Sequence, residues 1–420
     1  MKKVILLLFL SIVFLKAEVL TLKECIDAAL KNNPDVKSIA FKLEQSKEDT
    51  KREKASYLPK VDITLDYSPS KTFTVPTPKG IDTQNESATH ADITLYQKIY
   101  DFDKTKSKVD IAKTNEELMQ LSLKEAQNLL VLQIKQLYDV LILEKLSSRV
   151  AKNDLFIKEE LYKEAKTFAS LGMKTRADEL RFYASLIEAK DELEKTKSSY
   201  TKNLLSLQRL SGLKIDENIG LEENLNKEKY KDKKSAIELL EKNNLLLISE
   251  SKKIEKSISS FNEAKSADYP EISAYAYYSQ EDGISSYDTN GIGIRAVIPL
   301  YNGGSVNAKK ERAHLEMLVA KEEFSSKKLA LAQELEALLV DAKRYDGTIE
   351  AKKIVAISAK EAYELMNARY KEGLATYLEV LDAAEFYSRS EFSYVRAVFE
   401  KNAIVNKIDY LLNSDEEYVR

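Results

Sequence analysis

The chain has 420 residues, of which 32% are charged, with eleven Gly, seven Pro and a formal net charge of −3. This composition is typical of long helices, and the charge excludes a basic field for nucleic acid. The single cysteine excludes an internal disulfide, and with two histidines it leaves little material for a metal site or a catalytic pair. Phosphate-binding glycine loops and Gly-x-Ser-x-Gly elements are absent from the sequence, so we expect neither a cofactor nor an enzymatic activity.

Residues 1–17 predict a secretory signal peptide. Two lysines follow Met1, an apolar run extends from Val4 to Leu15, and Ala17 ends the segment. A membrane anchor helix is the alternative, but the run is shorter than the about 20 residues that span a bilayer. We therefore expect cleavage near Ala17 and export. Cys25 follows Lys and Glu where a lipidation site has small residues, so we interpret it as a core residue.

The remaining chain is one unit of roughly 200 residues present twice, a duplicated domain rather than a solenoid. Ile26–Asn33 returns as Ile237–Asn244, and further along Gly172 matches Gly373. The copies differ in length between residues 68 and 91, where Pro, Thr, Gly and Asn indicate an exposed loop. We expect a first repeat over 18–213, a connecting segment over 214–234, a second repeat over 235–413 and a C-terminal tail over 414–420.

Each repeat begins with two helices and a β-hairpin. In the first repeat, a short helix is predicted from Thr21 to Asn32 and a charged one from Asp35 to about Ser56. Strict alternation of apolar and polar residues then predicts strands over 60–67 and 91–99, and over 272–278 and 292–300 in the second repeat. The hairpins therefore occupy 60–100 and 270–300, with strands of about ten residues.

A long helical hairpin follows each β-hairpin. The stretch from Lys104 to Leu171 has no Gly or Pro, and the stretch from Ser305 to Glu372 has only Gly347. Such helices span about 100 Å, and their apolar spacing fits a coiled-coil seam. Gly172 and Gly373 mark the reversals, so the hairpins are expected over 104–212 and 305–413.

Four strands with one apolar face cannot close a barrel alone, and open edges are not viable in lipid. The sheet closes only with strands from other copies, eight from two chains or twelve from three. This argument predicts an oligomeric channel, with a barrel in a bacterial outer membrane and a helical tunnel beyond it. A soluble periplasmic coiled-coil scaffold or adaptor protein is the alternative, and an envelope hydrolase is more distant.

The chain resembles the TolC-like outer-membrane efflux proteins over essentially all of its mature length. The motifs that carry the resemblance lie at 30–34 (LKNNP), 57–59 (YLP), 298–304 (IPLYNGG) and 369–383 (RYKEGLATYLEVLDA). The resemblance implies a mainly α fold with a small β part. Three copies would form a twelve-stranded transmembrane β-barrel, and their duplicated helical hairpins an α-helical barrel closed at its periplasmic end.

The resemblance also implies function. Such a homotrimer is a passive exit channel of a tripartite efflux or type I secretion system, located in the outer membrane with its helices in the periplasm. Its partners are an inner-membrane transporter and a periplasmic adaptor. Its cargo is exported small molecules, metal ions or proteins.

Three acidic residues are candidates for a selectivity ring at the periplasmic constriction. Glu379 and Asp382 share one helix face just after the second turn, and Asp178 occupies the position of Glu379 in the first repeat. They match acidic positions of the family, although a solvated helix face is the simpler interpretation. In a trimer they would gather carboxylates, favour cations and raise their own pKa values by repulsion.

Further candidates concern closure and the membrane interface. Tyr370 matches a tyrosine that helps to close the family's tips, together with the turn residues Gly172 and Gly373. The family's arginine is replaced by Ala375, and Arg176 is a possible substitute. Six tyrosines near strand ends predict aromatic belts at the lipid interface, although ordinary strand composition explains them too: Tyr67, Tyr96, Tyr100, Tyr277, Tyr278 and Tyr301.

Overall fold

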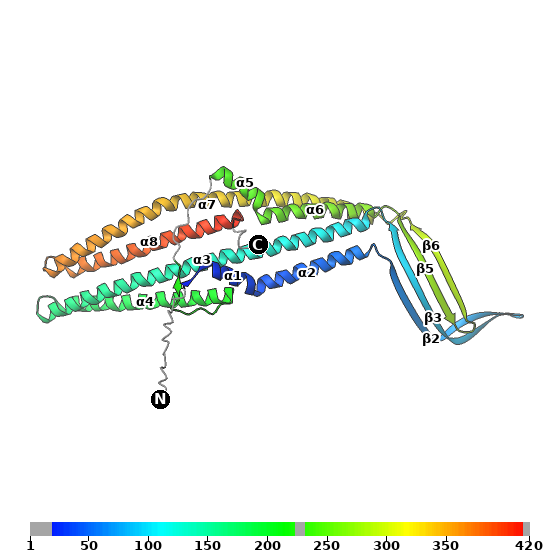
Figure 1. The fold of residues 1–420 in the computed structure, drawn as a ribbon, viewed down its shortest axis with the longest axis horizontal. Helices are drawn as coiled ribbons and strands as arrows, with labels where there is room; N and C mark the ends of the chain where they lie inside the picture. The colour runs from blue at the N-terminus through cyan, green and yellow to red at the C-terminus, as the bar shows by residue number, and fades with distance from the viewer. Residues whose placement is uncertain (1–18, 223–231, 415–420) are drawn as a thin grey trace, which may run out of the picture. The chain divides into compact units, whose positions relative to one another are not determined.

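The computed structural model describes residues 19–222 and 232–414 (Figure 1). The predicted signal peptide lies outside the described residues, as do parts of the predicted connecting segment and C-terminal tail. The described chain is mainly helical with a small sheet part, as expected. Within these two ranges no helix combines the length and the apolar character needed to cross a membrane.

The first repeat contains α1 (Leu22–Asn32), α2 (Pro34–Ala55), α3 (Lys104–Ser170) and α4 (Arg176–Ser211). The second contains α5 (Lys233–Asn243), α6 (Leu245–Ser266), α7 (Ser305–Lys371) and α8 (Tyr377–Leu411). These bounds agree with the helices predicted from Gly, Pro and capping residues. Cys25 is fully buried on α1, as predicted for a core residue, and burial raises the pKa of its thiol to about 12.

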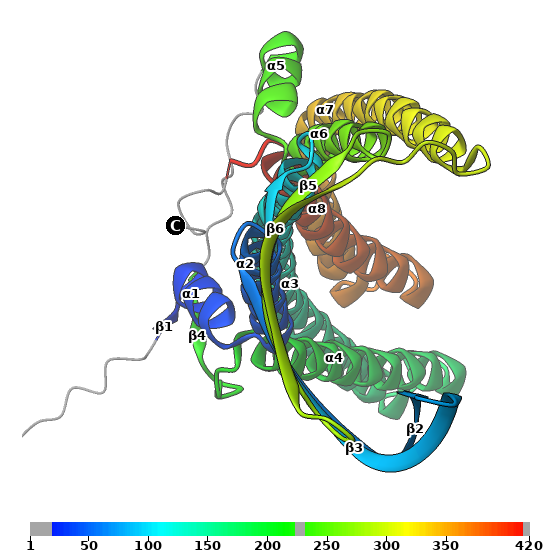
Figure 2. The same cartoon turned by 90° about the vertical axis from the view of Figure 1, so that its right-hand side faces the viewer.

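The chain divides into two compact units, which we describe separately. The helical unit holds the described residues up to Lys37, Lys124–Asn244 and those from Ala330 onward, and the sheet unit holds Ser38–Leu123 and Leu245–Leu329. In the helical unit, α7, α8, α3 and α4 lie side by side in that order (Figures 1 and 2). This arrangement is a single layer of helices.

The repeated Asn-Asn pair explains how each return helix is held in the helical unit. The Asn32 and Asn33 side-chain amides donate to the carbonyl oxygens of Ser211 (3.2 Å) and Leu210 (3.4 Å) at the end of α4. In the second repeat, Asn244 donates to Leu411 O at the end of α8 (2.9 Å). The last carbonyls of a helix have no partner within the helix, and in both repeats asparagine side chains supply hydrogen bonds to them.

A short parallel pair of strands was not expected from the sequence. In the helical unit, β1 (Val19–Leu20) pairs with β4 (Gly220–Leu221) from the connecting segment. The Tyr138 hydroxyl on α3 donates to Leu20 O (2.7 Å) and accepts from Glu222 N (2.9 Å). The start of the described chain and the connecting segment are therefore both tied to α3.

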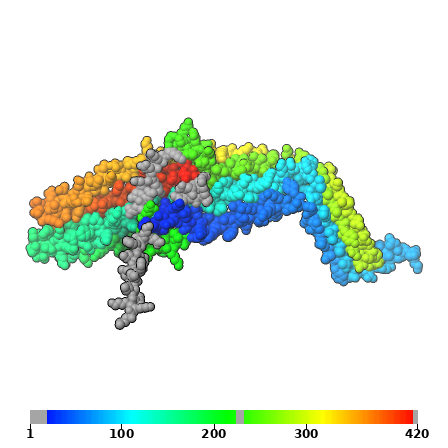
Figure 3. Space-filling view, in the orientation of Figure 1, coloured from blue at the N-terminus to red at the C-terminus, as the bar shows by residue number. Residues whose placement is uncertain are grey.

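The sheet unit carries one antiparallel sheet in the order β2-β3-β5-β6. Its strands are β2 (Lys60–Thr77), β3 (Gly80–Tyr100), β5 (Glu271–Asp282) and β6 (Tyr287–Val297). The space-filling view shows no helix over the visible side of the sheet (Figure 3). Register and alternation place the apolar residues on one face: Val61, Ile63, Leu65, Ile93, Leu95, Ala276, Tyr278, Ile292 and Ile294.

The predicted loop over 68–91 is wrong. The β2–β3 ladder continues after a register shift between Ser68 and Lys71 and reaches Thr77 opposite Gly80. Proline suggested a loop, but Pro69 falls at the shift and Pro76 lies on an edge strand, both of which tolerate a missing N–H. The second hairpin departs in the other direction, since β6 ends at Val297, before the Pro299 that cannot donate to a ladder.

Glycine on β6 makes room for two tyrosine rings of β5. Tyr275 pairs with Gly293 and Tyr277 with Gly291, on the face opposite the apolar one. A Cβ at Gly293 would lie 2.8 Å from the Tyr275 hydroxyl oxygen, and one at Gly291 would lie 2.7 Å from Tyr277 Cε1. Any side chain at these glycines would displace a ring.

Candidate functional site at the helical hairpin tips

Both helical hairpins of the helical unit reverse through the same backbone turn. Gly172 and Gly373 adopt left-handed φ values of 72° and 74°, which glycine reaches at no steric cost. Just beyond, Met173 N donates to Phe168 O (2.9 Å) and Leu374 N donates to Arg369 O (2.8 Å). This geometry is a Schellman motif, which satisfies the last carbonyls of α3 and α7.

Each return helix then begins with a capping box. Asp178 N donates to Thr175 Oγ1 (3.2 Å), and Thr175 N donates to Asp178 Oδ2 (3.1 Å). In the second hairpin, Glu379 N donates to Thr376 Oγ1 (3.3 Å), and Thr376 N donates to Glu379 Oε2 (2.7 Å). Two predicted ring acids therefore also have a local task, which is to cap α4 and α8.

The capping contacts affect how Glu379 titrates. The Thr376 backbone N–H and then its hydroxyl lower the pKa of the Glu379 carboxyl, opposite to the rise expected from a ring. Glu379 and Asp382 are both exposed on α8, and Asp178 is half-buried on α4. Within one chain, Asp178 lies close enough to Tyr370 to raise the pKa of the Tyr370 hydroxyl. A ring of carboxylates from several copies stays a prediction.

Tyr370 is fully buried in a socket built by the first hairpin. Its ring centroid lies 5.9 Å from that of Phe168 and 5.8 Å from that of Phe182, and Lys174 Nζ lies 5.2 Å from it. The pKa of Tyr370 is raised to about 12, mainly by burial and to a smaller extent by the nearby Asp178 and Glu164. Its hydroxyl forms no hydrogen bond within residues 19–222 and 232–414, so packing holds the ring.

Of the two residues considered beside this tyrosine, Ala375 lies in its cluster and Arg176 does not. Ala375 is buried in the same apolar cluster. Arg176 forms an ion pair with the buried Glu179 on its own helix. Its role in closure stays a prediction. The observed links between the two hairpins near the tips are the aromatic contacts of Tyr370 and the ion pair between Lys371 and Glu164 (3.0 Å).

A buried lysine near the tips was not predicted from the sequence. Lys158 on α3 is 3% exposed, and its Nζ makes no hydrogen bond to any described residue. Glu385 Oε1 on α8 lies 3.9 Å away. Burial lowers the pKa of Lys158, while Asp154, Glu385 and then Glu188 oppose that shift. The sequence gives one indication of this residue: the first repeat has the charged Lys158 at the position where the second repeat has Ala359.

In the sheet unit, the proposed aromatic belt is divided between two faces. Tyr67 and Tyr278 share the apolar face, whereas the register places Tyr96 and Tyr277 on the opposite one. Tyr100 ends β3, and Tyr301 lies outside the strands and is 89% exposed. Over residues 19–222 and 232–414, no group of three His, Cys, Asp or Glu side chains is arranged to hold a metal ion.

A family model and several solved structures match most of the chain. The sequence model of a family described as outer membrane efflux protein matches residues 25–213 and 236–398. Outer membrane protein TolC of Salmonella enteritidis is 29% identical over 117 residues, which are 27% of this chain and 24% of TolC. The match thus spans about a quarter of that curated relative.

Solved structures share the fold at low identity. VceC, an outer membrane protein of Vibrio cholerae, has a TM-score of 0.83 at 16% identity, covering 93% of this chain and 95% of VceC. The CmeC outer membrane channel of Campylobacter jejuni has a TM-score of 0.83 at 17% identity, covering 94% of this chain and 89% of CmeC.

Proposed function

Because the chain belongs to the outer membrane efflux protein family, we propose that three copies form an exit channel served by an inner-membrane transporter and a periplasmic adaptor. The family resides in the bacterial outer membrane, with the helical part in the periplasm. The cargo would be small molecules, metal ions or proteins. The channel is passive in this proposal, so the partner transporter supplies the energy.

One observation carries the proposal: the sheet exposes an apolar face and two open edges. Ile63, Leu65 and Ile294 are 68%, 74% and 77% exposed on that face. Among the described residues, the outer edges of β2 and β6 pair with no further strand. In lipid the apolar face is favourable, but each unpaired backbone group costs several kcal/mol. Pairing β6 of one copy with β2 of the next removes both edges, and three copies give twelve strands.

The long helices support the periplasmic part of the proposal. α3 and α7 have 67 residues each, which corresponds to about 100 Å of helix. A single layer of four helices needs neighbours to enclose a lumen. In the trimer, Asp178, Glu379 and Asp382 would recur three times at the tips and favour cations there.

Placing arginine on each face of the sheet tests the proposal. Ile294→Arg on the apolar face costs about 2–4 kcal/mol per copy at mid-membrane, so trimers should fail to assemble in membranes. Thr64→Arg on the opposite face should assemble and conduct in planar bilayers. Equal trimer yields from the two variants would contradict the barrel. Release of wild-type protein by osmotic shock would favour the soluble scaffold.

A further inference from the structure

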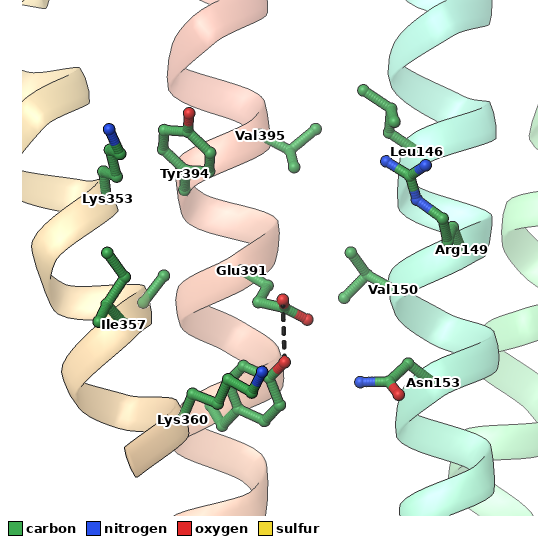
Figure 4. Close-up of a pocket in the computed structure, with 12 residues that line it drawn as sticks. Leu146, Arg149, Val150, Asn153, Lys353, Ile357, Lys360, Glu391, Tyr394 and Val395 are labelled. Carbon is green, nitrogen blue, oxygen red and sulfur yellow. Dashed lines mark hydrogen bonds between the residues drawn. The ribbon is translucent and has the colours of Figure 1, made fainter. Parts of the chain in front are cut away.

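A groove in the helical unit has no role in the channel proposed above. Its volume is about 590 Å³, and α3, α7 and α8 all contribute to it. Figure 4 shows the residues of α8 between those of α7 and those of α3. The volume falls in the range of small-molecule sites, about 300–1,000 Å³. Its uncharged lining is largely apolar or aromatic: Leu146, Val150, Asn153, Ala356, Ile357, Tyr387, Tyr394 and Val395.

The charged lining of the groove is mostly basic. Arg149, Lys353 and Lys360 face a single carboxylate, that of Glu391. Glu391 Oε1 already accepts a hydrogen bond from the Tyr387 hydroxyl (3.0 Å), drawn as the dashed line in Figure 4. The groove therefore has an excess of positive charge in a chain whose formal net charge is −3.

The cations of the groove lack strong partners. Arg149 and Lys353 form no ion pair or hydrogen bond with any residue in 19–222 or 232–414, and Lys360 Nζ lies 3.9 Å from Glu364 Oε1. Elsewhere on the same helices, Lys371 Nζ lies 3.0 Å from Glu164 Oε1. Arg149 and Lys353 are exposed beside the apolar lining, so both side chains are free to pair with a negative group bound in the groove.

We propose that this groove binds an amphipathic organic anion. The apolar and aromatic side chains would cover a ring system, and Arg149 and Lys353 would donate to a carboxylate, sulfate or sulfonate group. The lining is confined to residues 146–153, 353–360 and 387–395, about two turns of each helix. A partner helix would contact a longer stripe, so this extent favours a small molecule.

A fluorescent anion tests the proposal on the full-length protein in amphipol. The probe is naphthalene-2-sulfonate, whose emission is free of indole background because the chain has no tryptophan. Anisotropy titration should show saturable binding of one probe per chain. The neutral 2-naphthol, with the same rings, should bind at least about 10-fold more weakly, since it lacks the charge-assisted hydrogen bonds.

Matched charge removals locate the site. Arg149→Gln combined with Lys353→Gln should weaken sulfonate binding at least about 10-fold. Lys352→Gln, at an exposed residue outside the lining, should leave it unchanged. Circular dichroism and trimer yield verify that both variants fold.

Several results would overturn the proposal: no wild-type binding, equal affinity for 2-naphthol, undiminished binding by the double variant, or an equal loss in Lys352→Gln. Binding of an acidic helical peptide without binding of the sulfonate would identify a protein-docking surface instead. Bilayer conductance of the same samples tests the channel separately, so a failure of one proposal is distinguishable from a failure of the other.

Discussion

The two hairpin tips share a backbone and differ in where they place large side chains. Both have a left-handed glycine followed by a threonine cap and an acidic partner. At equivalent positions, however, the first hairpin has Ala169 where the second has Tyr370, and Lys158 where the second has Ala359. Duplication has therefore preserved the local geometry, whereas the large side chains have become complementary, since Tyr370 of the second hairpin packs against Phe168 and Phe182 of the first.

Truncation of Tyr370 is the strongest test of this complementarity. Tyr370→Ala removes a fully buried ring and should cost about 3–5 kcal/mol of local stability, by analogy with other buried aromatic truncations. We expect a higher open probability in planar bilayers and a lower melting temperature.

The matched control is Tyr370→Phe. Because the hydroxyl has no hydrogen-bond partner among the described residues, this variant should close like the wild type and be at least as stable. A constitutively open Tyr370→Phe channel would show that a hydrogen bond, and not the aromatic socket, closes the tips.

Substitution of Lys158 should give the next largest effect, and it should raise the stability of the protein instead of lowering it. Lys158→Met removes a buried ammonium without a hydrogen bond and should stabilise the protein by about 1–3 kcal/mol. The folded-state pKa is lowered, so the wild-type penalty is full below that pKa and disappears as pH rises toward the unfolded value of about 10.4. Urea unfolding against pH should show an alkaline rise in stability for the wild type and none for Lys158→Met.

How much of this was predictable differs between fold and site. Gly172 and Gly373 mark helix ends by residue type, so the helices followed from the sequence. The strands around Pro69 and Pro76 did not, because proline signals a loop unless the edge position of β2 is known. Phe168 and Phe182 carried no local signal, since their partner Tyr370 is about 200 residues away and only packing brings them together.

The acidic residues of the second tip should act on ions. Glu379→Gln combined with Asp382→Asn should weaken block by trivalent cations at least about 10-fold, with normal trimer yield. Asp178→Asn, in the other hairpin, is the comparison variant and should have a smaller effect. Undiminished block in the double variant would make these carboxylates ordinary surface groups.

The same block should depend on pH in a defined direction. Hydrogen bonds from Thr376 lower the pKa of Glu379, and repulsion across a lumen is screened over about 8 Å at physiological salt. Glu379 should thus keep its charge, and its contribution to stability, above about pH 4.3 and lose both as pH falls through its lowered pKa. Thr376→Ala should shift the midpoint of block upward.

Removal of the caps should give the smallest effect and test the symmetry of the tips. Thr175→Ala and Thr376→Ala each delete one hydroxyl acceptor and should cost about 1 kcal/mol. The Thr376 hydroxyl also donates to Glu379 Oε2 (2.9 Å), so Thr376→Ala should cost somewhat more than Thr175→Ala in chemical denaturation. A larger cost for Thr175→Ala would contradict this order.

The glycines of β6 have a consequence for sequence evolution. Because a Cβ at Gly293 would meet the Tyr275 hydroxyl oxygen, position 293 cannot gain a side chain while the Tyr275 ring stays in place. A lineage that gains a side chain at 293 is expected to move the ring at 275 or to replace it with a smaller residue. The residue types at positions 275 and 293 should therefore covary among relatives, and so should those at positions 277 and 291.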